Sequence, residues 1–315
     1  MLVSSLSIRA SGETADALAS GASVRKDVGV QVPPRPQLSI GKVFIVVQAF
    51  SELLDSRSLL WNLTLRELRS KYRRSFLGWA WSLLNPLSNM LIYTFVFGVV
   101  FGATAPIGEP SGLNVYALYL LCGILPWGFF SQVTNLGMNA LLSNASLVRK
   151  VAFARETLVI SQVIFCFVQW SIEMSLLAVV LIIAGSPILP WLPVTILLMV
   201  CLAVYGAGFA LALSAAAVFF RDLRYLWTIL IQVMFFATPI IYTPDRLEGK
   251  LPAFIEFIMT WNPMAVFILQ FRHMLYGGSV PNWGEMLYVI VVSICVFIAG
   301  WAIFSRLSRR VAEEL

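Results

Sequence analysis

The chain has 315 residues, of which 59% are hydrophobic and only 12% are charged, and its mean hydropathy is +0.84. Soluble domains carry about 25% charged residues, so this composition excludes an ordinary soluble enzyme and predicts an all-α integral membrane protein. The net charge of +6 does not indicate nucleic-acid binding, because the cations lie beside apolar runs, as topology signals do.

The N-terminal part of the chain divides into a tail and an interfacial region. Residues 1–40 are rich in Ser, Ala and Gly and lack the apolar core of a removable signal peptide, so we expect a flexible cytoplasmic tail. Residues 41–75 are expected to form interfacial helices, the second of which is amphipathic. Its apolar residues recur at helical spacing and its cations fill the other faces: Trp61, Leu65, Leu68 and Tyr72 against Arg66, Arg69, Lys71, Arg73 and Arg74. A soluble amphipathic helix is the alternative interpretation.

Residues 76–310 are predicted to form one transmembrane domain with six spans. The first span carries no charge, and its length at about 1.5 Å per residue is enough to cross a hydrocarbon core of about 30 Å. The predicted spans are 76–101, 116–142, 157–184, 194–220, 225–242 and 284–304. With both termini in the cytoplasm, this topology leaves only Arg246, Lys250 and Arg272 outside, out of 22 lysines and arginines.

The segment between the fifth and sixth spans is too polar to cross the membrane and too apolar to be a solvated loop. Two short apolar runs, AFIEFIM and MAVFILQF, are separated by Trp261-Asn262-Pro263. Two short re-entrant half-helices at about 252–275, dipping into the outer leaflet, best explain this pattern.

Motifs for catalysis are missing from the sequence. It contains no phosphate-binding loop of the GxxxxGK[ST] type, no HExxH and no GxSxG, and its single histidine has no second histidine to share a metal site. We therefore predict no catalytic, cofactor-binding or metal-binding residue on this chain, and a role other than that of an enzyme.

Polar residues inside two predicted spans have two interpretations each. Glu173 lies well within the third span, with Gln169 one turn away. An intramembrane carboxylate is costly, so it either bonds helices or a dimer seam together or lines a pore. Gln132, Asn135 and Asn139 form a second polar stripe, which is more typical of helix–helix contacts.

Aromatic residues gather at the first span and its approach, among them Trp79, Trp81, Tyr93 and Phe95. Such residues commonly form interfacial belts or pack toward lipid. A sugar conduit is the alternative, because an aromatic face packs on the apolar face of a sugar ring without trapping it. We list these four and Glu173 as candidate channel-lining residues.

Five motifs occur in order over residues 50–310, after the basic helix: SFLGWAWSLLNPLSNMLIYTFVFGVVFG, LVRKVAFARETLVIS, FFRDLRYL, TPIIYTPD and WNPMAVFILQFRHMLYG. Together they resemble the permease subunit of ABC-2 type polysaccharide exporters, the family that moves O-antigen, teichoic acid, capsule and galactan chains out of bacteria. Its overall character is similar to that of the actinobacterial galactan exporters. It departs from the family pattern at Ala154, where proline is expected, and in the long tail before residue 40.

The resemblance implies a homodimer in the bacterial inner membrane, joined to two copies of a separate ATPase subunit that carries ATP and Mg. It implies a lipid-linked polysaccharide as substrate and a channel at the dimer interface. Alternatives are an ABC-2 permease for a drug or small lipid, an integral membrane enzyme, and a transporter of another class.

The resemblance also implies two functional elements. Residues 143–156 would be the coupling helix that docks into the ATPase, although plain topology charge explains its cations equally well. Its candidate residues are Leu147, Arg149, Lys150, Arg155 and Glu156. Residues 58–75 would be a gate helix near the inner mouth, with candidate residues Trp61, Arg66, Arg69, Tyr72, Arg73 and Arg74.

Overall fold

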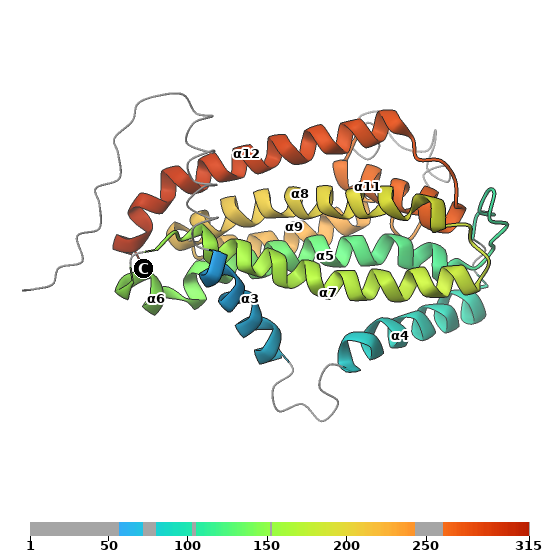
Figure 1. Ribbon diagram of the computed structural model, residues 1–315, viewed down its shortest axis with the longest axis horizontal. Helices are drawn as coiled ribbons and strands as arrows, with labels where there is room; N and C mark the ends of the chain where they lie inside the picture. The colour runs from blue at the N-terminus through green and yellow to red at the C-terminus, as the bar shows by residue number, and fades with distance from the viewer. Residues whose placement is uncertain (1–56, 72–79, 103–104, 152, 243–260, 315) are drawn as a thin grey trace, which may run out of the picture. The chain divides into compact units, whose positions relative to one another are not determined.

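The computed structural model describes residues 57–71, 80–102, 105–151, 153–242 and 261–314 (Figure 1). Every regular element in these ranges is a helix. The predicted tail 1–40, the first part of the interfacial region and the first of the two predicted half-helices lie outside the described residues.

Four long apolar helices form the body of the described chain. They are α5 (Tyr116–Ser143), α7 (Glu156–Ile183), α8 (Leu192–Phe219) and α12 (Trp283–Glu314). Each contains a stretch long and apolar enough to cross a membrane. Figure 1 shows them side by side. The second, third, fourth and sixth predicted spans are thus confirmed as long apolar helices.

Backbone-to-backbone packing joins α8 to α12. A Cβ atom built on Gly300 would lie 2.0 Å from the carbonyl oxygen of Gly208, and one built on Gly208 would lie 2.6 Å from the carbonyl oxygen of Val296. Only glycine permits this approach. Close contacts through small residues are common between helices in lipid, because no hydrophobic effect drives those helices together. These two positions therefore fix the distance between the two helices.

The fifth predicted span is shorter than expected. Helix α9 (Leu223–Ala237) has 15 residues, which cover about 23 Å, less than a hydrocarbon core of about 30 Å. It ends because Thr238 precedes Pro239: proline disfavours the helical region for the residue before it, and Thr238 has extended backbone angles (φ −100°, ψ 135°). The prediction of one helix as far as Tyr242 is wrong, and the chain turns at 238–242.

The described part of the first predicted span consists of α4 (Trp81–Tyr93) and the π-helix η3 (Thr94–Val100), which follow each other without a break. Gly102 then takes a positive φ of 56°, which favours glycine and turns the chain into the following loop. Residues 76–79 of this span lie outside the described residues, so a full crossing here stays a prediction.

The second predicted half-helix is confirmed as helical: α11 (Pro263–Phe271) continues into the π-helix η6 (Arg272–Gly277). The Asn262-Pro263 pair explains where it starts. The Asn262 side-chain oxygen accepts a hydrogen bond from the Met264 N–H (3.0 Å), and Pro263 occupies the first turn, where its missing N–H costs nothing. Gly278 ends the segment in a left-handed conformation (φ 66°). Its place in the outer leaflet stays a prediction.

Arg272 connects this segment to two others. Its side chain is only 4% exposed, and its guanidinium donates to the carbonyl oxygens of Tyr119 (3.3 Å), Pro239 (2.6 Å) and Ile240 (2.5 Å). It also lies 3.7 Å from the centre of the Tyr119 ring, a cation–π distance. The predicted topology counted Arg272 among the cations on the outer side. In the structure Arg272 is buried, and it bonds η6 to α5 and to the turn after α9.

Candidate functional site

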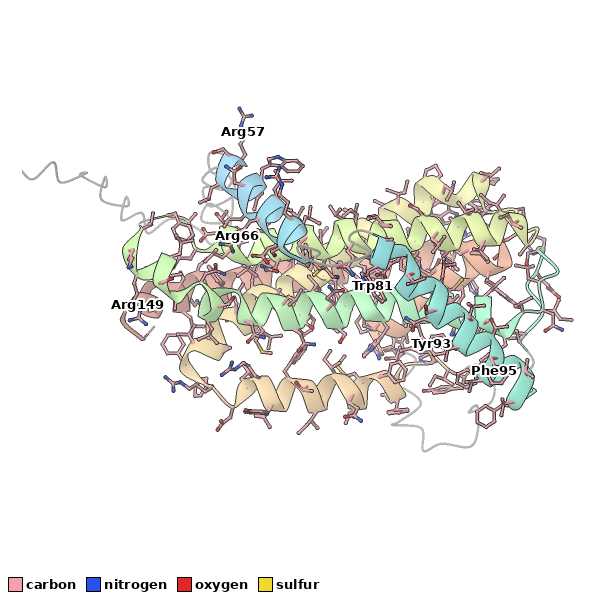
Figure 2. All side chains as sticks on the ribbon, turned by 90° about the horizontal axis from the view of Figure 1, so that it is seen from below. Arg57, Arg66, Trp81, Tyr93, Phe95 and Arg149 are labelled. Atoms are coloured by element: carbon pink, nitrogen blue, oxygen red, sulfur yellow. The ribbon has the colours of Figure 1, made fainter. Side chains whose placement is uncertain are left out.

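The predicted coupling segment contains a six-residue helix, α6 (Ala145–Lys150), between α5 and α7. Val148 is buried and Leu147 packs against the core, whereas Arg149 and Lys150 are exposed. Figure 2 shows Arg149 pointing away from the ribbon beyond the end of α5. The two apolar residues thus hold α6 to the protein and present its two cations outward.

The other two candidate residues of this segment face inward. Arg155 Nη1 donates to the carbonyl oxygen of Ser308 on α12, and Glu156, the first residue of α7, is buried. The Arg155 bond fastens the segment to the C-terminal helix. Of the five residues listed from the sequence, only Arg149 and Lys150 offer exposed charge to a partner.

The helix predicted at 58–75 as a gate is observed as a helix, α3 (Arg57–Lys71), and residues 72–75 lie outside the described range. The gate role stays a prediction. It packs along α7 and buries Leu63 and Thr64. Trp61 is 60% exposed, and Leu68 is half-buried. Leu63 is therefore an apolar contact between α3 and the protein, and the interfacial role of Trp61 stays a prediction.

Two of the four candidate arginines, Arg66 and Arg69, lie on α3. Arg66 Nη2 donates to Glu67 Oε1 (2.7 Å) and to Asn144 Oδ1 (3.1 Å), the residue immediately before α6. Arg69 is exposed. Tyr72, Arg73 and Arg74 lie outside the described residues. The candidate gate helix and the candidate coupling segment are thus in direct contact through Arg66 and Asn144.

A polar network surrounds Glu173. Gln169 Nε2 donates to Glu173 Oε1 and Gln132 Nε2 donates to Gln169 Oε1, each at 3.4 Å. Lys71, the last residue of α3, donates to Gln169 and lies 5.6 Å from the centre of the Phe165 ring. Partial burial lowers the pKa of Lys71, and the nearby Glu173 opposes this by raising it. The network ties α3, α5 and α7 together, which favours the helix-bonding interpretation for Gln132 and Gln169.

The candidate aromatic residues do not share one surface (Figure 2). Tyr93 is half-buried and packs on Phe97 (ring centroids 6.2 Å), which in turn contacts Tyr116 of α5 (5.4 Å). Phe95 is 61% exposed, and Trp81 is exposed at the far end of α4. Trp79 lies outside the described residues. Tyr93 therefore joins η3 to α5, and only Phe95 and Trp81 are free to line a path.

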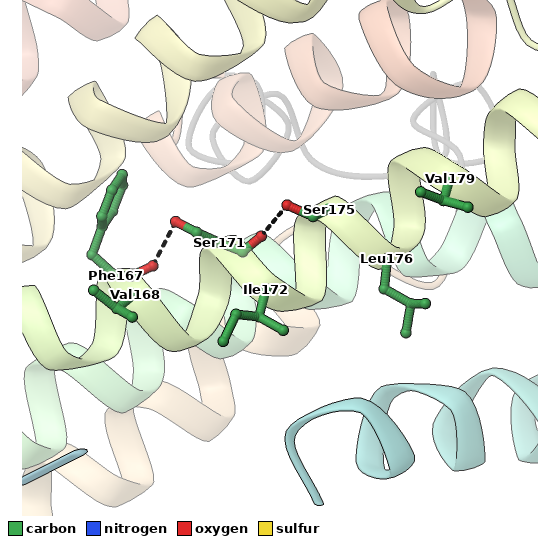
Figure 3. Close-up of a pocket in the computed structure, with 7 residues that line it drawn as sticks. All are labelled: Phe167, Val168, Ser171, Ile172, Ser175, Leu176 and Val179. Carbon is green, nitrogen blue, oxygen red and sulfur yellow. Dashed lines mark hydrogen bonds between the residues drawn. The ribbon is translucent and has the colours of Figure 1, made fainter. Parts of the chain in front are cut away.

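A wide hollow of about 520 Å³ lies along α7 (Figure 3). The hydroxyl groups of Ser171 and Ser175 donate to carbonyl oxygens of their own helix, at 2.7 Å each. The other lining side chains are apolar: Phe167, Val168, Ile172, Leu176 and Val179. This hollow suits apolar groups, and it offers little to a sugar.

Residues 58–276 match the ABC-2 type transporter family. The chain belongs to that family. This ABC-2 membrane protein is 29% identical over 258 residues to the O-antigen export system permease protein RfbA of Klebsiella pneumoniae, covering 82% of this chain and 95% of the relative. The corresponding protein of Myxococcus xanthus is 27% identical over 274 residues, covering 86% and 100%. The polysialic acid transport protein KpsM of Escherichia coli is 21% identical over 247 residues, covering 77% and 90%.

Two features of this ABC-2 protein were missed by the sequence reasoning. The first is the Lys71–Gln169 contact, because a bond between residues 98 positions apart leaves no trace in periodicity. The second is the role of Arg272, for which a signal existed: it is a cation in an apolar run on the side where the topology places few cations.

Proposed function

We propose that this chain is the transmembrane subunit of an ABC transporter that exports a lipid-linked polysaccharide, of O-antigen, teichoic acid or galactan type, across the bacterial inner membrane. The observation that carries the proposal is the extent of the similarity. It spans 90–100% of the length of relatives named for O-antigen export and polysialic acid transport. No feature of the described residues favours the alternative of a drug or small-lipid permease.

The energy for export comes, in this proposal, from a separate ATPase subunit that carries ATP and Mg. Two observations support this: the sequence has no phosphate-binding loop, and α6 carries a pair of exposed cations. Two copies of the chain and two ATPase subunits make up the proposed transporter. Arg149 and Lys150 meet an acidic groove on the ATPase, while Arg155 and Glu156 keep α6 fixed to the membrane part.

The substrate enters, in this proposal, beside α3. Arg69 is exposed on this helix and Arg66 is partly exposed. In the proposal, both meet the pyrophosphate of a lipid-linked sugar at the inner leaflet. Guanidinium groups donate paired hydrogen bonds to phosphate oxygens. Both termini are cytoplasmic in this proposal, and for the C-terminus the contact of Arg155 with α12 supports it.

Deleting the gene tests the proposal in the cell that carries it. Loss of an exporter stops delivery but not synthesis, so surface polysaccharide should fall while lipid-linked polymer accumulates on the inner leaflet. Both pools are measured by extraction and gel analysis before and after surface digestion with a glycosidase. Unchanged pools, together with sensitivity to a drug, would favour the small-molecule alternative.

A further inference from the structure

A second hollow lies where α7 and α12 both pack against α8. Its volume is about 310 Å³, and it is lined by four residues of α7, four of α8 and two of α12. On α8, the small side chains of Ala203 and Ala207 leave the space open. Val200 lines it too and is 44% exposed, so the hollow opens to the surroundings of the protein. We call it the three-helix groove.

The three-helix groove lies at membrane depth. Its walls are three of the helices that are long and apolar enough to cross a membrane. Nine of its ten lining side chains carry no polar group. Apolar cavities stay dry and take up apolar molecules, and sites for small molecules have volumes of about 300–1,000 Å³. The groove therefore fits a hydrocarbon chain.

A contact between α7 and α12 closes one end of this groove. Arg155, which precedes α7, donates from Nη1 to the carbonyl oxygen of Ser308 on α12. Ser308 lies about two turns beyond Trp301 on the same face of α12, and Arg155 lies about one and a half turns before Ile160. The bond therefore crosses the line of the groove and places a guanidinium at its end.

Two buried polar groups lie between this guanidinium and the apolar lining. Thr157 is fully buried on the side of α7 that carries Ile160 and Ile164, and its hydroxyl has no hydrogen-bond partner among the described residues. Trp301 lines the groove and is 3% exposed, and its indole N–H has no acceptor in the described part of the chain. Buried donors in folded proteins are nearly always bonded, so these two groups indicate a molecule that brings acceptors to this end.

The chemistry of the groove narrows the identity of that molecule. It needs an apolar chain, then hydrogen-bond acceptors, then a negative charge. A phospholipid supplies these in the same order as acyl chain, ester oxygens and phosphate. Glu156, buried next to Arg155, offsets part of the positive charge, and Arg306, exposed on α12, adds to it. Basic pockets between membrane helices on the cytoplasmic side bind anionic head groups.

We propose that the three-helix groove holds one anionic phospholipid of the inner leaflet. An acyl chain lies against Ala203 and Phe297, and the ester oxygens accept from Thr157 and Trp301. The phosphate meets Arg155, whose guanidinium has a planar fork of donors that suits phosphate. The inference takes the cytoplasmic side of Arg155 from the proposed function, and it does not depend on which polymer is exported.

The first test identifies the occupant in the full chain. A photoreactive p-benzoylphenylalanine replaces Val200 in vesicles of equal parts phosphatidylglycerol and phosphatidylcholine, and mass spectrometry identifies the cross-linked molecule. Phosphatidylglycerol should exceed phosphatidylcholine about fivefold, the factor that one cation near a membrane surface contributes. Ile303 is the matched control, because it is 42% exposed on α12 and is not among the groove residues. Its adducts should follow the composition of the membrane.

The second test measures stabilisation by the same lipid. Phosphatidylglycerol should raise the melting temperature of the unaltered protein in detergent more than phosphatidylcholine does. Ala203→Phe, which fills the groove, and Arg155→Gln, which removes the charge, should each lose this difference. Arg155→Lys should keep part of it, and Ile303→Phe should keep all of it. The two lipids are compared within each variant, so a lower starting stability does not hide the result.

Other occupants give different results. Adducts at Val200 with peptides from residues 1–56, with a second copy of the chain or with the lipid-linked sugar would overturn the inference. Equal proportions of the two lipids at Val200 and Ile303 would overturn it as well, as would a phosphatidylglycerol shift that survives both Ala203→Phe and Arg155→Gln. Failure of the unaltered protein to export polysaccharide would contradict the proposed function alone, because these lipid measurements need no export.

Discussion

The guanidinium of Arg272 joins α5, η6 and the turn after α9 through three carbonyl oxygens. Gly123 makes room for it, since a Cβ atom there would lie 3.0 Å from Arg272 Nη2. A planar group with several fixed donors meets this need, whereas a lysine ammonium cannot reach all three oxygens in the same geometry.

Arg272→Lys should therefore destabilise the protein by about 2 kcal/mol, because hydrogen bonds from charged groups contribute about 1.5–3 kcal/mol and unpaired buried acceptors add to the loss. Thermal unfolding of the detergent-solubilised protein measures this. Arg224→Lys, exposed on α9, is the control and should melt like the unaltered protein. Equal melting of both variants would show that Arg272 is not a structural tie.

Single residues also show where sequence reasoning reached its limit at the candidate site. The sequence placed Arg149, Lys150 and Arg155 together as one cationic turn, and in the structure the first two are exposed while Arg155 bonds to Ser308. Charge and spacing are local properties of the sequence. The burial of Arg155 against α12, however, depends on the position of Ser308, more than 150 positions away. Contacts of that kind leave no local pattern in the chain.

At the scale of elements, α8 and α12 meet through Gly208 and Gly300. Gly300→Ala would force the helices apart, and overpacking of this kind costs about 1–3 kcal/mol or more. We expect a lower melting temperature. Gly128→Ala, where an added Cβ meets nothing within 4 Å, should be neutral or slightly stabilising, since alanine favours a helix. A tolerated Gly300→Ala would mean that α12 moves freely on α8.

Helix α6 is the element through which we expect the ATPase to act. Arg149→Glu with Lys150→Glu should abolish export, and it should either release the ATPase or leave ATPase turnover unaffected by this chain, because two exposed attractive charges become repulsive toward an acidic groove. Co-purification and ATPase turnover report this. The matched control reverses Arg221 and Arg224, which are exposed at the turn between α8 and α9. Normal export by the α6 variant would refute the coupling role.

Helix α3 gives a test that separates arginine chemistry from charge. Replacing Arg66, Arg69, Arg73 and Arg74 by lysine keeps an attraction of about 1 kcal/mol per cation to anionic lipid but loses paired donation to phosphate. The lysine variant should insert and assemble, yet accumulate lipid-linked polymer inside the cell. Full export by this variant would show that these arginines only anchor the helix to the membrane.

Element boundaries followed the sequence where local chemistry decides them. The break at Trp261-Asn262-Pro263 between the two apolar runs coincides with the start of α11, because capping and proline placement act within one turn. The end of α9 was missed because hydropathy continues through Thr238 and Pro239, while the backbone restriction of proline overrides it. For α3, periodicity found the helix but not its buried side, which depends on the surface of α7.

At the scale of the whole molecule, the arrangement predicts a membrane topology. Reporter domains fused after Lys150, Asp222 and Arg309 should report the cytoplasmic side, and those after Gly108 and Gly249 the outer side, because nearly all cations then stay inside. Paired phosphatase and fluorescent-protein fusions measure each position. An outward reporter at Lys150 would contradict both the span order and the coupling role of α6.

Export itself can be measured in inverted inner-membrane vesicles that contain this chain, its ATPase and pre-formed lipid-linked polysaccharide. The cytoplasmic face of such vesicles is outermost, so polymer awaiting export is open to an added glycosidase. We expect ATP to move the polymer into the lumen and protect it from digestion, with no protection when Arg149 and Lys150 are both Glu. Polymer that stays equally digestible with and without ATP would contradict the assignment of this protein as a polysaccharide exporter.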